Sequence, residues 1–280
     1  MRSLMRSPSI GFAGAVFGIA ICFGQSAQHN QTEPANFYQV YQYGTPAMGR
    51  LFPTFWTTYV ANGDGANEHH GQGAAGLAAW STELDYGVTD RLSLATYFDV
   101  QALHGSGPQF TGGQIESQYR FRNPYDLPVN LAVFGKYYIP FKSYNRSQEL
   151  ELRLIVEKDH QNFRFDLNPK VNISTTGPRA GSGPRLGFDA AVAWRRFFRA
   201  QPGLEYYSNY GAISHSTGGK DIEQLLFPTI DFRLGHNLDW KVGAGIGLNA
   251  DASDLILVRS SLTYEFQGIS SRRLLSSQNQ

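Results

Sequence analysis

The amino-acid sequence predicts an all-β fold, specifically a transmembrane antiparallel up-and-down β-barrel of about 12 strands. Three observations predict it. Runs of alternating apolar and polar residues recur along the chain, whereas helical periodicity is nearly absent. Most runs are about 10–13 residues long, while strands of soluble proteins average about 5–6 residues and membrane-spanning strands need about 9–11. Long glycine-rich connections mostly alternate with short ones along the chain, as external loops alternate with periplasmic turns in outer-membrane barrels.

The composition by itself fits two classes of protein. The 280 residues carry a net charge of +1, 17% charged residues and a mean hydropathy of −0.32. Near-neutrality argues against a nucleic-acid partner, and the negative mean hydropathy argues against a bundle of transmembrane helices. The same values describe a soluble β domain or a barrel that averages an apolar outer face with a charged inner face.

The first element is a predicted secretory signal peptide over residues 1–27. Arg2 and Arg6 precede an uncharged apolar run at 11–23, and small residues follow it. A transmembrane anchor would need about 20 apolar residues, which is more than this run provides. The only cysteine, Cys22, lies inside the predicted signal, so disulfides and thiolate metal sites are excluded from the mature chain.

Residues 28–52 precede the first clear strand. Phe37, Tyr41 and Tyr43 partly alternate with polar residues in this stretch. The pattern fits a periplasmic segment, a plug inside the barrel or an additional strand, and the sequence does not choose among these three.

The barrel is predicted over residues 53–267, followed by a polar tail at 268–280. The segment 162–173, NFRFDLNPKVNI, shows the pattern clearly, because every second residue from Phe163 is apolar or near-apolar and the residues between are polar. The same template predicts strands at 53–62, 76–88, 92–103, 112–123, 129–141, 149–159, 162–174, 186–197, 203–214, 224–235, 240–249 and 255–266.

The lengths of the connections predict which end of the barrel is external and which is periplasmic. The long linkers are predicted to be external and the tight ones periplasmic, although the short linker 249–254 would also be external. An even number of strands leaves both termini on the periplasmic side. The predicted external linkers are 62–73, 104–109, 175–185 and 214–223, and the predicted periplasmic turns are 87–91, 123–128, 159–162, 199–202 and 236–239.

One stretch carries a family resemblance. Ser81 to Leu94 reads STELDYGVTDRLSL, in which an acidic-aromatic strand end runs through a tight turn into the next strand. It resembles a recurrent element of bacterial outer-membrane barrels of the phenol meta-degradation family and related outer-membrane transporters. The residues that carry the match are Glu83, Tyr86, Gly87, Thr89, Asp90 and Arg91. The resemblance implies an outer-membrane, transport-like role and supplies no substrate.

The polar faces of the predicted strands hold most of the charge. A charge on the lipid face costs about 2–4 kcal/mol for Arg or Lys at the midplane, so these side chains are predicted to point into the lumen. The predicted lumen charge network comprises Glu83, Asp85, Asp99, Glu116, Arg120, Arg122, Lys136, Glu151, Arg153, Arg164, Asp166, Lys170, Asp189, Arg195, Asp231, Arg233, Arg259 and Glu265. Because barrels of about 8 strands are filled and those of 16–18 leave a channel, a lumen of intermediate size fits either a narrow pore or a salt-bridged interior.

Four aromatic residues also fall on predicted inner faces: Tyr97, Phe134, Tyr138 and Tyr207. They would contact a small apolar or aromatic solute, or they would fill space. The histidines of the predicted external loops show no repeated ligand spacing, so we expect no metal site and no cofactor. No nucleophile motif is present, so we expect no enzyme.

The expected function is therefore a narrow channel or transporter for small solutes, apolar or aromatic ones among them. Two alternatives remain open at this point: a structural or surface barrel with a closed lumen, and a secreted soluble β-domain that binds a ligand. The expected partners are outer-membrane lipid, a small-molecule solute and the barrel-insertion machinery, and no nucleic acid.

Overall fold

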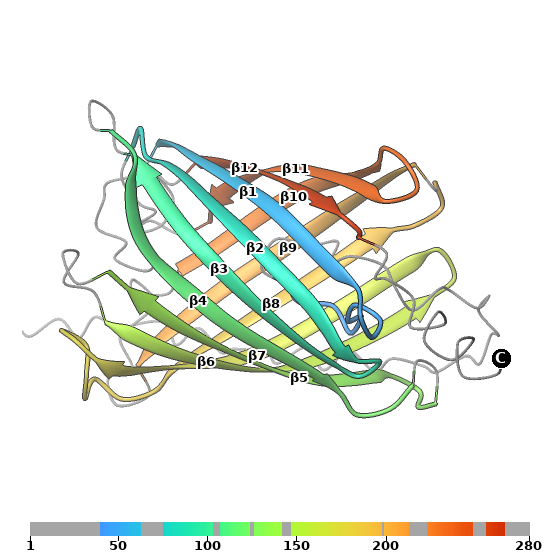
Figure 1. Ribbon diagram of the computed structural model, residues 1–280, viewed down its shortest axis with the longest axis horizontal. Helices are drawn as coiled ribbons and strands as arrows, with labels where there is room; N and C mark the ends of the chain where they lie inside the picture. The colour runs from blue at the N-terminus through green and yellow to red at the C-terminus, as the bar shows by residue number, and fades with distance from the viewer. Residues whose placement is uncertain are drawn as a thin grey trace, which may run out of the picture.

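The computed structural model is a closed barrel of twelve antiparallel strands, each paired with its neighbours in sequence and β1 paired with β12 (Figure 1). This confirms the predicted fold class. The strands are β1 (Leu51–Asn62), β2 (Ala78–Thr89), β3 (Leu92–Ala102), β4 (Gln109–Arg120), β5 (Asn130–Pro140), β6 (Gln148–His160), β7 (Phe163–Thr176), β8 (Arg185–Trp194), β9 (Ala200–Ala212), β10 (Glu223–Arg233), β11 (Leu238–Gly247) and β12 (Ile256–Tyr264).

The structure describes residues 40–62, 75–102, 107–123, 126–141, 147–197, 199–212, 223–248 and 256–266. The predicted signal peptide, the predicted C-terminal tail and the histidines of the predicted external loops lie outside these residues. No helix within the described part of the chain is long and apolar enough to cross a lipid bilayer.

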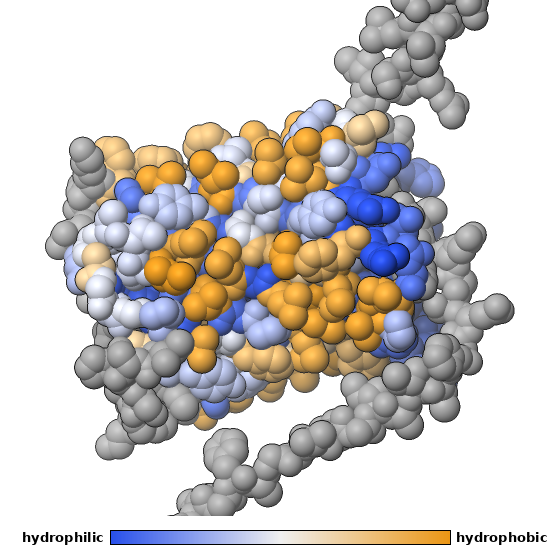
Figure 2. All heavy atoms as spheres, turned by 90° about the horizontal axis from the view of Figure 1, so that it is seen from below, coloured by the Kyte–Doolittle hydropathy of each residue, from blue (hydrophilic) through white to orange (hydrophobic). Residues whose placement is uncertain are grey.

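The strands form where the sequence alternates, because alternation lets one strand face two different environments. In β7 the side chains of Phe163, Phe165 and Leu167 are exposed on the outside, and those of Arg164 and Asp166 are buried inside. The same pattern around the barrel leaves at least one large apolar side chain exposed on the outside of every strand. Figure 2 shows one side of this apolar outer surface, with orange side chains across the middle of the barrel. An outer surface of this kind is stable in lipid and not in water.

The strand ends differ slightly from the prediction. β1 starts at Leu51, two residues earlier than expected, and Leu51 also bridges to Phe266 beyond β12. β6 and β7 are joined by a two-residue link in which Gln161 adopts a left-handed φ of 53°. Such a compact link matches the predicted tight turn at 159–162, and its periplasmic placement stays a prediction.

The interior is packed by side chains from the wall and from the residues that precede β1. One apolar cluster combines Val40 with residues of several strands, among them Tyr207 and Phe227. A second cluster combines Tyr43 with Phe134 and Ile155. Residues 40–46 therefore lie largely inside the barrel, and residues 47–50 connect them to β1; we call residues 40–50 the inner segment (blue loop before β1 in Figure 1).

The apolar outer surface makes a direct prediction about stability. Leu152 lies in the middle of β6 with its side chain outside and 43% exposed. We expect Leu152→Arg to lower the free energy of unfolding from lipid vesicles by about 2–4 kcal/mol, because the guanidinium would face hydrocarbon. Leu234→Arg is the control, because Leu234 is exposed in the link between β10 and β11, and the cost near an interface is about 0–1 kcal/mol. Equal losses in denaturant titrations of the two variants would contradict a lipid-facing band.

Candidate functional site: the lumen and its inner segment

The lumen is lined by charged residues that the strand alternation turns inward. A buried cluster lies around Asp189 of β8, whose side chain is 0% exposed. Arg153 of β6 donates to Asp189 at 2.7 Å and to Glu151 at 2.6 Å, and Lys170 of β7 donates to both Asp189 oxygens at 2.7 Å. These residues form a compact network that joins three strands from inside.

A second cluster lies toward the end of β6 and the start of β7. Arg164 contacts Asp159 at 3.3 Å and Glu157 at 3.7 Å, and Arg195 contacts Asp159 at 3.4 Å. Asp166 stands opposite Glu157 in the register of β6 and β7 and is 1% exposed. Neither of its carboxylate oxygens has a hydrogen-bond partner within the described residues.

Other predicted lumen charges are paired individually. Lys136 and Glu116 form an ion pair at 2.8 Å. Glu265 pairs with Arg50 of the inner segment. Further contacts join Arg233 to Asp239, Arg259 to Thr58 and Asp99 to Ser81 and Gln114, while Asp231 stands opposite Lys241 in the register of β10 and β11.

Two arginines near the end of β4 differ from each other. Arg120 is buried, donates to the carbonyl of Asp90 and lies over the ring of Tyr43 at 5.4 Å. Arg122 lies two residues beyond the end of β4 and is exposed, so its place in the lumen charge network stays a prediction. The alternating pattern of the sequence continues for two residues after the strand has ended.

The inner segment is hydrogen-bonded to the wall through its backbone. Tyr41 donates its N–H to the Asn168 side chain at 2.5 Å, and the Asn168 amide donates back to the Tyr41 carbonyl at 3.0 Å. The Gln118 amide donates to the carbonyls of Gln42, Tyr43 and Gly44 at 2.8–3.1 Å. Side chains of β4 and β7 thus satisfy backbone groups of a segment that has no strand partner of its own.

Side chains of the inner segment add further contacts. The Tyr41 hydroxyl donates to Glu116 at 2.9 Å, and the Tyr43 hydroxyl donates to the carbonyl of Arg122. Burial raises the pKa of both phenols, so both remain protonated donors at neutral pH. Arg164 donates to the Gln42 side chain at 2.8 Å. The segment is therefore positioned by several independent contacts.

The far end of the inner segment is held by the turn between β2 and β3. Met48 donates its N–H to the Asp90 carboxylate at 3.2 Å, and Gly49 donates to the carbonyl of Gly87 at 2.8 Å. Gly87 in turn donates to the carbonyl of Arg50 at 3.0 Å. The stretch that carries the family resemblance thus provides the anchor for the inner segment.

The four predicted inner aromatic residues are all buried in the lumen. Tyr97 donates to Glu116 at 3.1 Å, and Phe134 packs on the ring of Tyr41 with centroids 3.9 Å apart. Tyr207 donates to Glu205 and contacts the ring of Phe227. Each of these contacts fills the interior, and a role of these side chains in contacting a solute stays a prediction.

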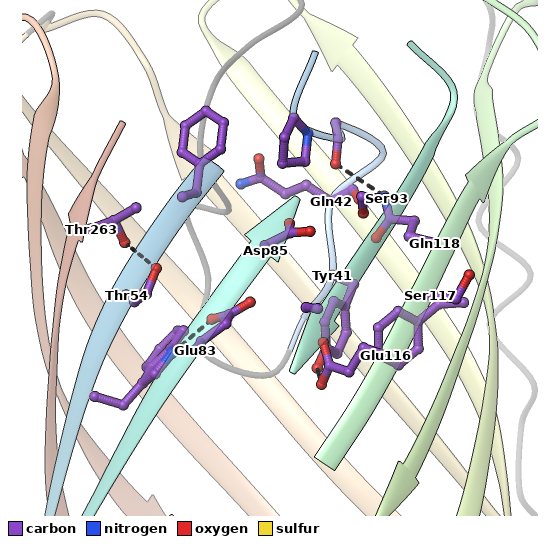
Figure 3. A pocket seen from close by; sticks show the side chains of 16 residues that line it. Tyr41, Gln42, Thr54, Glu83, Asp85, Ser93, Glu116, Ser117, Gln118 and Thr263 are labelled. Atoms are coloured by element: carbon purple, nitrogen blue, oxygen red, sulfur yellow. Dashed lines mark hydrogen bonds between the residues drawn. The ribbon is translucent and has the colours of Figure 1, made fainter. Parts of the chain in front are cut away.

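A pocket opens between the inner segment and the wall made by β1 to β4 (Figure 3). Figure 3 shows Glu83 and Asp85 of β2 facing Tyr41 and Glu116 across it. Trp56 and Phe52 of β1 and Phe134 of β5 contribute aromatic surface. The sequence predicted Glu83, Asp85, Glu116 and Phe134 as lumen residues. It could not reveal that the inner segment supplies one side of the pocket.

Comparison with known proteins finds solved structures that share the fold. No family model and no curated protein matches the chain. Among solved structures, the KdgM porin in complex with disordered oligogalacturonate has a TM-score of 0.54 at 7% identity, covering 77% of this chain and 99% of that one. The NanC porin gives a TM-score of 0.54 at 8% identity, covering 77% of this chain and 99% of that one.

A third structure, the COG4313 outer membrane channel from Pseudomonas putida F1, has a TM-score of 0.54 at 13% identity and covers 80% of this chain and 97% of that one. At these identities the likeness shows a shared barrel fold. What each protein passes or binds is a property of that protein.

Proposed function

We propose that this chain is a narrow channel of the bacterial outer membrane that passes small solutes without catalysing a reaction. In this proposal residues 1–27 direct export and are removed, and the barrel-insertion machinery places the barrel in the outer-membrane lipid. The single observation that carries the proposal is the combination of an apolar outer surface with a charged lumen in one closed barrel.

The inner segment narrows this channel in the proposal. Its residues are anchored to lumen side chains of β4, β6 and β7 and to the turn after β2. A segment held this way restricts the cross-section available to a solute. The pocket described above lies beside this restriction.

The proposed solutes are small and carry an apolar or aromatic part. The aromatic lining of the pocket by Trp56, Phe52 and Phe134 supports this class. An acidic oligosaccharide such as the oligogalacturonate bound to the KdgM porin fits less well, because Glu83 and Asp85 of the pocket would repel its carboxylates.

Solute entry into liposomes tests the proposal. The folded chain, reconstituted into liposomes, is expected to let small aromatic alcohols and short polyols enter faster than protein-free liposomes do, with a steep decline as solute size increases. Swelling rates measured by light scattering report this entry. Rates equal to those of protein-free liposomes for every solute would contradict a channel.

One observation favours a second candidate function, a structural barrel with a closed lumen. Buried ion pairs around Asp189 and the inner segment together fill much of the interior. A closed barrel would leave the swelling rate at the background value in the intact chain and also in a chain whose inner segment is displaced.

Substitution of Gly87 would displace the inner segment without removing any of its side chains. A Cβ on Gly87 would lie 2.6 Å from the carbonyl oxygen of Pro46 and against the carbonyl of Ala47, which are both backbone atoms. We therefore expect Gly87→Ala to push the inner segment away from the wall and to increase the swelling rate. Gly235→Ala is the matched control, since nothing lies within 4 Å of the added Cβ. Identical rates for the two variants would argue against a restriction by this segment.

A further inference from the structure

The two halves of the lumen differ in how their charges are balanced. β6, β7 and β8 carry acids and bases in contact, such as Asp189 with Arg153 and Lys170. β1, β2 and β3 contain no lysine, arginine or histidine, yet β2 and β3 place Glu83, Asp85 and Asp99 in the lumen. The near-equal number of acids and bases in the whole lumen therefore hides an acidic wall.

The pocket described above lies against this acidic wall. The three carboxylates that line it are Glu83, Asp85 and Glu116, and no lysine, arginine or histidine is among the described lining residues. Glu116 forms an ion pair with Lys136 at 2.8 Å and accepts hydrogen bonds from the hydroxyls of Tyr41 and Tyr97. Glu116 thus has its charge partner already.

The two carboxylates of β2 are different. Glu83 accepts a hydrogen bond from the Trp56 indole N–H at 2.8 Å, which is a neutral donor. Asp85 has an oxygen, Oδ1, that is shielded from solvent and has no hydrogen-bond partner within the described residues. No lysine, arginine or histidine among the described residues lines the pocket beside these two carboxylates, so the pair favours a ligand that brings N–H groups and positive charge.

Aromatic surface stands beside these carboxylates on the neighbouring strand. In the register of β1 and β2, Phe52 is opposite Asp85 and Thr54 is opposite Glu83, while Trp56 reaches Glu83 directly. Ring faces attract cations and accommodate apolar groups. The wall thus offers negative charge and an aromatic surface within a few residues of each other.

We propose that this pocket binds a small protonated amine that carries an apolar or aromatic body. Its ammonium group lies between the carboxylates of Glu83 and Asp85, and its body packs on Trp56 and Phe52. A metal ion suits the site less well, because no group of three or more His, Cys, Asp or Glu side chains in the described residues is arranged to hold one. The proposal rests on the proposed channel function, since it names a solute class for that lumen.

Binding is measured on the full folded chain in detergent by isothermal titration calorimetry. The probes are benzylammonium, benzyl alcohol and benzoate, which share a ring and differ in the charge and donor capacity of one group. We expect benzylammonium to bind about tenfold or more tightly than the alcohol and benzoate to bind most weakly, because only the ammonium brings charge-assisted donors. Equal affinity for the three probes would overturn the proposal.

Neutral isosteres locate the site. Glu83→Gln combined with Asp85→Asn is expected to weaken benzylammonium binding by about tenfold or more and to leave benzyl alcohol binding unchanged. Asp99→Asn is the matched control, because Asp99 is a lumen carboxylate of the same acidic wall that does not line the pocket and already accepts from Ser81 and Gln114. The single variants Glu83→Gln and Asp85→Asn keep the test available if the double variant does not fold. Unchanged benzylammonium affinity in the folded double or single variants would overturn the site.

Swelling measurements on the same preparations separate this proposal from the channel proposal. Liposome swelling without selective benzylammonium binding overturns the amine pocket and leaves the channel standing. Selective binding that is lost in the β2 variants, in a chain that supports no swelling, supports the pocket and overturns the channel.

Discussion

Removal of residues 31–47 is expected to raise the single-channel conductance of the barrel several-fold. This deletion keeps the predicted signal peptide with its flank, and it leaves β1 intact from Leu51. The segment lost contributes Val40 and Tyr43 to the two interior clusters, and its backbone carbonyls accept from the Gln118 amide. Because these contacts lie inside the barrel and no strand pairing depends on them, their loss widens the lumen and spares the wall.

Planar-bilayer recordings of the intact and shortened chains measure this increase. A chain in which residues 40–47 are replaced by glycine and serine of equal number is the control, because it keeps the length and removes the anchoring side chains. We expect its conductance to lie between the other two and to fluctuate. If all three chains gave the same conductance, the inner segment would not restrict the pore.

Asp189→Asn is expected to lower the free energy of unfolding by about 3–5 kcal/mol, because it leaves two buried cations without their shared counter-charge. Asp189 is fully buried and contacts Arg153 and Lys170 at 2.7 Å each. Denaturant titration of the chain in lipid vesicles, followed by heat-modifiable gel migration, measures the change.

Two comparisons make this result specific. Asp239→Asn removes one partner of a more exposed ion pair with Arg233, so its expected cost is about 0–1 kcal/mol. Adding Lys170→Met to Asp189→Asn removes one uncompensated cation and is expected to recover part of the loss. A cost for Asp189→Asn no greater than that for Asp239→Asn would show that the lumen network does not stabilise the barrel.

The strands could be predicted from the sequence because the barrel wall separates two environments at every residue. In β7, Phe163, Phe165 and Leu167 face outward and Arg164 and Asp166 face inward, and this division is visible in the sequence as strict alternation. The apolar outer surface follows from the same rule. Strand ends were less certain, as Arg122 demonstrates, since alternation does not stop where hydrogen bonding to the next strand stops.

The pairing of side chains in the lumen could not be predicted. Alternation assigns a residue to the inner face, but it gives no information about neighbours from other strands. Arg153 and Asp189 lie on β6 and β8, two strands apart, and meet because the barrel curves around them. Likewise, the separation of the acidic wall from the ion-paired half becomes visible only when the strands are placed in order.

The inner segment illustrates a third kind of limit. Residues 28–52 fitted a periplasmic segment, a plug or an additional strand. The short alternation of Tyr41, Gln42 and Tyr43 is compatible with each of these three structures. The deciding interactions are made by Asn168 and Gln118, which lie far away in the sequence. Local pattern therefore could not reveal them.

The most direct test of the central claim is the planar-bilayer conductance of the intact folded chain. A narrow channel with a charged lumen and an inner segment predicts discrete current steps of small, uniform size in salt solution. Bilayers that stay silent, although heat-modifiable migration shows that the reconstituted chain is folded, would contradict the claim that this barrel is a channel.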